Sequence, residues 1–75
     1  MDDQKIKVYI KVNDQNEIID INSDIFINDF SGWIEVDEGF GDKYAHAQGL
    51  YLDEPLIDDN GGYNYVFERN EITKK

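Results

Sequence analysis

The fold is decided by one stretch near the N-terminus, Lys5-Ile6-Lys7-Val8-Tyr9-Ile10-Lys11-Val12, in which every second residue is Ile or Val. Successive side chains of a β-strand point to opposite faces, so all of these branched residues would lie on one face. A turn rich in Asn and Asp follows, and residues 17–22 then resume the pattern with Ile19 and Ile21 in alternation. The sequence therefore predicts a β-hairpin with one buried face.

The middle of the chain predicts two further short elements. Residues 24–30 are apolar and β-branched, and a short strand or an irregular loop anchored by Phe26 and Phe30 would account for them equally well. Residues 33–37 alternate as a strand does, and the two glycines that flank Phe40 predict a break directly after that strand.

Little helix is expected. Residues 44–48 predict the start of a helical turn, which Gly49 should stop before a second turn forms. Residues 50–52 then predict a short strand. Pro55 lacks a backbone N–H, so it marks the end of that strand or a position at a sheet edge.

The Asn-Gly pair at 60–61 predicts a tight hairpin turn, after which residues 63–68 pair back onto the chain. Residues 69–75 are expected to fray, with Ile72 as an extension of an edge. Together the patterns predict an all-β or mainly-β fold, a small antiparallel meander of four to six short strands with little helix. We expect a single domain that spans residues 1–75.

The size of the chain limits what it can do alone. With 75 residues it forms one domain at most and buries a smaller share of its surface than a domain of ordinary size. It has no cysteine, so neither a disulfide nor a thiolate metal site stabilises it. A thin core needs either very efficient packing or help from a partner or from self-association, and both explanations stay open.

The termini and the charge narrow the expected partners. Residues 1–5 are acidic and polar and no run reaches membrane-spanning length, so neither a secretory signal nor a membrane span is expected. The net charge is −10, and Lys43 alone stands among the carboxylates of the middle, since the other basic residues lie near the two ends. Nucleic acid and anionic membrane both require a basic face, so neither is an expected partner. The acidity fits a soluble surface, and it also fits a surface that docks on a basic partner.

No pattern in the sequence indicates a catalytic, cofactor or metal site. Carboxylate pairs are so frequent that none stands out as an acid–base pair, and a chain this short can hardly form a substrate cleft beside its core. Residues 58–62 lack the acid spacing of a calcium loop, and His46 is the only histidine in a chain without cysteine. We therefore expect no enzymatic activity, no cofactor and no bound metal.

Two runs carry a resemblance to known proteins, Gly32-Trp33-Ile34-Glu35-Val36-Asp37-Glu38-Gly39 and Gly41-Asp42-Lys43-Tyr44-Ala45-His46-Ala47-Gln48-Gly49. The chain resembles, over nearly its whole length, small acidic proteins encoded near tail-fibre genes in phages and phage tail-like particles of clostridia and related Firmicutes. The resemblance implies a structural role at a baseplate or tail fibre, in the virion or tail-like particle, with the host cytoplasm as the place of assembly. It carries over no catalytic or ligand residues.

The aromatic residues supply a site hypothesis, because large rings outnumber what a thin core can cover. Tyr and Trp often anchor protein interfaces, although rings also stack on sugars or simply complete the outer face of a small sheet. We expect contact with a tail-fibre or baseplate protein, with a homo-oligomer as a further association, and assign the contact to Trp33, Phe40, Tyr44, His46 and Tyr51. Open strand edges would add to it. Two alternatives stay open, a tail-fibre assembly chaperone and a carbohydrate-binding module for the host envelope.

Overall fold

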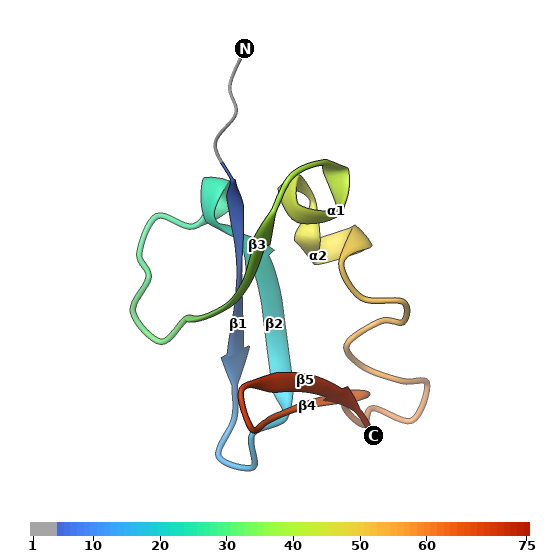
Figure 1. The fold of residues 1–75 in the computed structure, drawn as a ribbon. Coiled ribbons are helices and arrows are strands. Elements are labelled where there is room, and N and C mark those ends of the chain that lie inside the picture. The colour runs from blue at the N-terminus through green and yellow to red at the C-terminus, as the bar shows by residue number, and fades with distance from the viewer. Residues whose placement is uncertain (1–4) are drawn as a thin grey trace.

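A computed structural model describes residues 5–75. The expectation about a signal sequence concerns residues 1–5, of which residues 1–4 lie outside the described part of the chain. The prediction of a mainly-β fold made of short antiparallel strands is confirmed, since the described residues form five strands in two antiparallel sheets. The elements in chain order (Figure 1) are β1 (Ile6–Val12), β2 (Ile18–Ser23), the 3-10 helix η1 (Asp24–Phe26), β3 (Ile34–Gly39), α1 (Asp42–Ala45), α2 (Ala47–Leu50), β4 (Tyr65–Glu68) and β5 (Glu71–Lys74).

β1 is the central strand of the larger sheet, which has the order β2-β1-β3 with antiparallel neighbours. β4 and β5 form the second sheet. The chain leaves β2 and returns to the far side of β1, so the connectivity is not that of a serial meander. β1 has a strand on each side, and the middle of its apolar face packs on Ala47 and Tyr65, so Val8 and Ile10 are buried whereas Ile6 and Val12 are partly buried.

The predicted β1–β2 hairpin is confirmed, but Ile19 was assigned to the wrong face. The register pairs Ile10 with Ile21 and Val12 with Ile18, which leaves Ile19 as an extra residue in β2. Such a β-bulge interrupts the alternation of side chains. Ile18 and Ile21 are therefore both buried, whereas Ile19 is 39% exposed.

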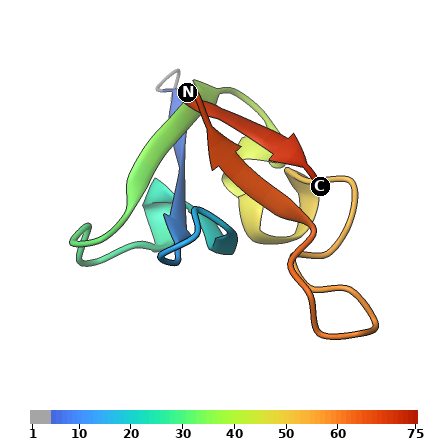
Figure 2. The same cartoon turned by 90° about the horizontal axis from the view of Figure 1, so that it is seen from below.

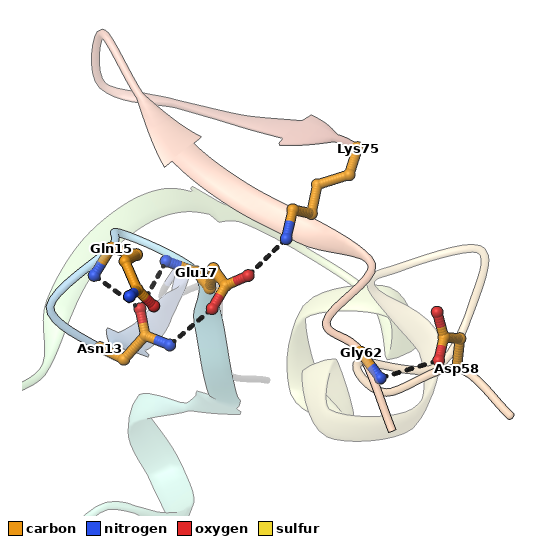
Figure 3. Close-up of polar contacts among 6 residues, drawn as sticks. All are labelled: Asn13, Gln15, Glu17, Asp58, Gly62 and Lys75. Atoms are coloured by element: carbon orange, nitrogen blue, oxygen red, sulfur yellow. Dashed lines mark hydrogen bonds and ion pairs between the residues drawn. The ribbon is translucent and has the colours of Figure 1, made fainter. Parts of the chain in front are cut away.

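The turn between β1 and β2 is built by the side chain of Asn13 (Figure 3). Its Oδ1 accepts hydrogen bonds from the backbone N–H groups of Gln15 and Glu17, each at 2.9 Å, and its Nδ2 donates to Glu17 Oε1 at 2.8 Å. The other carboxylate oxygen of Glu17 pairs with the ammonium of Lys75. The hydrogen bond from Lys75, followed by that from Asn13, holds the pKa of Glu17 below its ordinary value. The turn therefore also anchors the C-terminal strand.

Residues 69–75, expected to fray, instead form the second half of the β4–β5 hairpin. Arg69 and Asn70 both have positive φ, 53° and 64°, which is the backbone geometry of a two-residue turn that matches the twist of a hairpin. The Phe67 N–H donates to Asn16 O at 2.8 Å and Val66 pairs with Glu17. These bonds join β4 to the end of the first hairpin, where Figure 1 shows the two C-terminal strands crossing at the lower ends of β1 and β2.

The helical region differs from its prediction in extent. α1 begins at Asp42, directly after Gly41 with φ of 100°, and α2 runs through Gly49 instead of ending before it. The N–H groups of Gly49 and Leu50 both donate to His46 O, at 3.0 and 2.9 Å. A helical glycine costs only about 1 kcal/mol relative to alanine, which the packing of this region offsets.

The strand expected at residues 50–52 is absent from the described chain, because Leu50 ends α2 and an irregular loop follows. Only one bridge, Ile57 with Tyr63, precedes β4. The predicted turn at 58–62 does form: Asp58 Oδ1 accepts the Gly62 N–H at 2.8 Å (Figure 3). Residues 65–68, however, pair with β5 and not with residues 50–57. The loop around the turn projects away from the two sheets in Figure 2.

Residues 24–30 form η1 and an irregular loop, so the strand alternative for this segment is wrong. The irregular loop is the alternative that holds: Phe30 packs on Tyr9 of β1, with ring centroids 4.9 Å apart, and Phe26 lies beside His46. Both phenylalanines lie outside the core, at 56% and 45% exposed for Phe26 and Phe30. Ile27 is the buried residue of the segment. β3 also continues two residues beyond its predicted end, because Gly39 still pairs with Ile6 of β1.

The core lies on the inner face of the larger sheet, between that sheet, the helical turns and β4. Ser23, the buried polar residue at its edge, connects β2 to the helices: its Oγ donates to Tyr44 O and accepts the Ala47 N–H at 3.1 Å. The buried members of the core are Val8, Ile10, Ile18, Ile21, Ala47 and Tyr65.

Candidate partner-binding surface

The described residues expose as many large apolar side chains as they bury apolar residues, seven of each. Single exposed apolar side chains are ordinary, but this proportion is high for so small a core. The exposed members are Ile19, Ile25, Phe26, Phe30, Phe40, Leu50 and Ile57.

Tyr44 and Tyr51 are the two members of the predicted contact set that the structure brings together. Their ring centroids lie 5.9 Å apart in an edge-on arrangement, and Lys43 Nζ lies 4.9 Å from the centre of the Tyr51 ring. Gly39 makes room for Tyr44, since a Cβ at this position would lie 2.5 Å from the Tyr44 ring. Both tyrosines are half-buried and pack against the core, so they serve the fold as well as the surface.

The β1–β3 register explains how Asp37 reaches this cluster. Val8 pairs with Asp37 and Tyr9 with Glu35, so Val36 is an extra residue and Asp37 turns to the inner face of the sheet. There it accepts a hydrogen bond of 2.7 Å from the Tyr51 hydroxyl. Burial first, and then this bond, raise the pKa of Tyr51 above its ordinary value of 10.0.

This shift predicts a pH dependence. Above pH 10 the unfolded chain loses the Tyr51 proton while the folded chain keeps it, so the stability associated with this group is complete below pH 10 and declines above it. We expect Tyr51→Phe to lose less of its free energy of unfolding than the wild type between neutral and alkaline pH. Urea unfolding across this range measures the difference, with Tyr63→Phe as the control for removing one hydroxyl. Identical alkaline slopes for Tyr51→Phe and the wild type would contradict the raised pKa of Tyr51 in the folded chain.

Two clefts lie beside β3. One, of about 520 Å³, is bordered by Val36 and Asp37 of β3, by Lys43 and Tyr51, and by Glu71 and Ile72 of β5. The other, of about 560 Å³, is bordered by Ile34 of β3 and by Phe67, Arg69 and Asn70. The turn of the β4–β5 hairpin thus stands between two open spaces.

Among the described residues, no ring contact joins Trp33, Phe40 or His46 to the tyrosine pair. Trp33 is half-buried, with Lys11 Nζ 4.8 Å from its ring centre, and Phe40 is 58% exposed. The six residues of β3 separate these two rings, a span of roughly 20 Å. The predicted set is therefore not one patch, and its role in partner contact stays a prediction.

His46 belongs to a different apolar surface, which the sequence interpretation missed. Its ring centroid is 6.2 Å from that of Phe26, and both border a shallow cleft of about 400 Å³ together with Asn22, Gln48 and Gly49. We call this region, with the adjoining Ile25, the η1–α2 surface. The sequence signal for this surface is the pair of adjacent large apolar residues, Ile25 and Phe26. In the 3-10 turn that they form, consecutive side chains point in different directions and cannot both reach the core.

Glutamate and aspartate have different roles on the surface of the described residues. Lys5, just before β1, lies 3.8 Å from Glu38, and Lys7 of β1 lies 3.8 Å from Glu35, so these two lysines are matched to β3 on the outer face. Exposed pairs of this kind contribute little stability, but they compensate the basic N-terminal strand. Aspartates instead accept backbone N–H groups at turns, as Asp29 and Asp58 do. The excess negative charge of the surface is therefore carried largely by aspartate.

Comparison with known proteins identifies no relative: the chain matches no protein-family model, no curated protein and no solved structure. Within residues 5–75, no helix is long and apolar enough to cross a membrane. The same residues contain no group of three or more His, Asp or Glu side chains placed to hold a metal ion.

Proposed function

We propose that the chain acts by protein–protein contact, as a structural component of a phage tail or contractile tail-like particle, held against a tail-fibre or baseplate protein. The observation that carries the contact is the equal number of exposed large apolar and buried apolar residues in the described chain. The assignment to a phage tail or tail-like particle rests on the sequence resemblance described above. A partner would cover apolar surface that the small core leaves exposed.

The η1–α2 surface is the best candidate for the main contact. Phe26 and Ile25 are 56% and 61% exposed and adjoin each other, and the neighbouring cleft could receive a side chain from a partner. Aromatic residues set beside a pocket are typical anchors of protein interfaces. His46 at the rim connects this surface with the predicted contact set.

We expect Phe26→Ser to fold normally, because its side chain is largely exposed, but to bind its partner more than about tenfold less tightly. Purified tail particles from cells that make either form of the chain provide the measurement. Quantitative protein analysis should find the wild type in a fixed ratio to its fibre or baseplate neighbour and Phe26→Ser strongly depleted. Ile57→Ser, which changes an exposed apolar residue on the projecting loop, is the matched control and should stay at the wild-type level.

The same particles separate the structural role from the chaperone role. A chaperone that leaves after assembly would be missing from the finished particle even as the wild type. Equal incorporation of Phe26→Ser and the wild type would instead remove the η1–α2 surface from the contact.

A further inference from the structure

β3 has one long edge without a neighbouring strand. Among residues 5–75, its backbone bonds to a strand only through β1. β2, the other outer strand of this sheet, is approached by β4 at the Glu17–Val66 bridge and is tied to the helices by Ser23. β5 also has an open edge, but it has four residues against six in β3. An unpaired edge presents backbone N–H and C=O groups that a strand from another chain can satisfy.

Two clefts border parts of β3, one on each side of the turn of the β4–β5 hairpin. Ile34, at the start of β3, borders the larger cleft, and Val36 and Asp37 border the cleft on the β5 side. A strand laid along β3 would therefore have room for the side chains that point inward. Val36, Leu52 and Ile72 offer apolar contacts on the β5 side.

The charged residues around the free edge of β3 indicate which kind of strand can bind there. The cleft on the β5 side is bordered by three carboxylates, those of Asp37, Asp53 and Glu71, and by one ammonium group, that of Lys43. β3 itself carries Glu35, Asp37 and Glu38 and no basic residue, and of these Glu35 and Glu38 are already paired with Lys7 and Lys5, each at 3.8 Å. A second copy of the chain paired edge to edge would align these carboxylates with their equivalents, and like charges in opposed positions destabilise a sheet. A segment with positive charge would instead be attracted to these carboxylates.

We propose that the free edge of β3 binds an extended segment of a partner protein in which Lys or Arg alternates with apolar residues, so that the segment becomes an additional strand of the larger sheet. The inference rests on the proposed contact function and specifies a second part of the contact. Backbone bonds to β3 would position the strand, and its basic side chains would offset the carboxylates around it.

Hydrogen exchange of single amides, followed by NMR on the full chain, tests this inference with synthetic peptides. The probe is a peptide of the length of β3 in which Lys and Val alternate, added at millimolar concentration. One control peptide has Glu in place of Lys, and the other has Pro in place of Val and lacks half of the N–H donors. We expect outward-facing amides of β3 to exchange about tenfold more slowly with the Lys–Val peptide and to be unaffected by either control.

Three results would overturn the inference: no slowing with the Lys–Val peptide, equal slowing with the Glu–Val peptide, or slowing confined to strands other than β3. Slower exchange of β3 amides at high concentration of the chain without any peptide would identify a second copy as the occupant and would also overturn it. If Phe26→Ser is depleted from particles while the β3 amides show no slowing of hydrogen exchange, the proposed contact function holds and only the proposed binding of a strand to β3 is wrong.

Discussion

Replacing Ile10 by alanine should destabilise the isolated chain by about 2–5 kcal/mol, as removal of a fully buried branched side chain from a core generally does. Ile10 is 0% exposed in the central strand, and it pairs with Ile21 on one side and with Ile34 on the other. Stabilities of native proteins amount to roughly 0.05–0.15 kcal/mol per residue, so for a chain of this size the loss is a large part of the total. The variant should therefore unfold at a much lower urea concentration than the wild type, which urea titration followed by circular dichroism would show.

Ile25→Ala is the matched control for that variant. It makes the same chemical change at a side chain that is 61% exposed, so its free energy of unfolding should stay within about 0.5 kcal/mol of the wild type. A cooperative, wild-type unfolding curve for Ile10→Ala would show that the core does not depend on the centre of β1.

Ser23→Ala should cost about 1–3 kcal/mol although it removes a single oxygen atom. Ser23 is 0% exposed, and its Oγ is the acceptor for the Ala47 N–H and a donor to Tyr44 O. Alanine leaves these two backbone groups without their partner at the point where the helices join β2. We expect the unfolding midpoint in urea to fall, with the loss of structure greatest in α1 and α2.

Ser31→Ala provides the comparison, because Ser31 lies on an exposed turn of the chain. Its effect should stay within about 0.5 kcal/mol. If both serine variants unfolded at the same urea concentration as the wild type, the hydrogen bonds of Ser23 would not be what fastens the helices to the sheet.

The strands were predictable where the periodicity was undisturbed. The strict alternation in β1 correctly indicates a strand of which one face packs on the core, with Val8 and Ile10 buried. The face of Ile19 was not predictable, because a bulge changes which residues of β2 face inward without any change in composition. The same is true of Val36 in β3, whose bulge turns Asp37 toward Tyr51.

Both local and long-range contacts account for the remaining differences. The C-terminal residues form β5 because a local two-residue turn at Arg69–Asn70, with positive φ at both residues, brings them back against β4. The pair between Lys75 and Glu17 is a long-range contact that local sequence does not show. Gly49 remains helical because Ser23, distant in sequence, holds the neighbouring Ala47 N–H. The low helix propensity of glycine predicts a break at this position, but tertiary packing can override that preference.

The candidate surface could be predicted by residue type but not by position. Excess aromatic residues indicated that rings would be exposed, yet Tyr44 and Tyr51 pack against the core and the most exposed rings are Phe40 and Phe26. A ring is exposed or covered according to which strand edge or helical turn lies next to it. That arrangement depends on the bulges and on the Ser23 contacts, which the periodicity of the sequence does not show.

The claim that another polypeptide covers the exposed apolar surface of this chain is tested most directly by calorimetry. Thermal unfolding would be recorded for the isolated chain and again with increasing amounts of the proposed partner, a fibre or baseplate protein that co-purifies with the chain. A ligand that binds only the folded state raises the unfolding temperature as its concentration rises. We predict a chain that unfolds within or below the range of about 45–65 °C when alone and at progressively higher temperature with its partner. Unfolding above about 90 °C for the isolated chain, unchanged by the partner, would contradict the account.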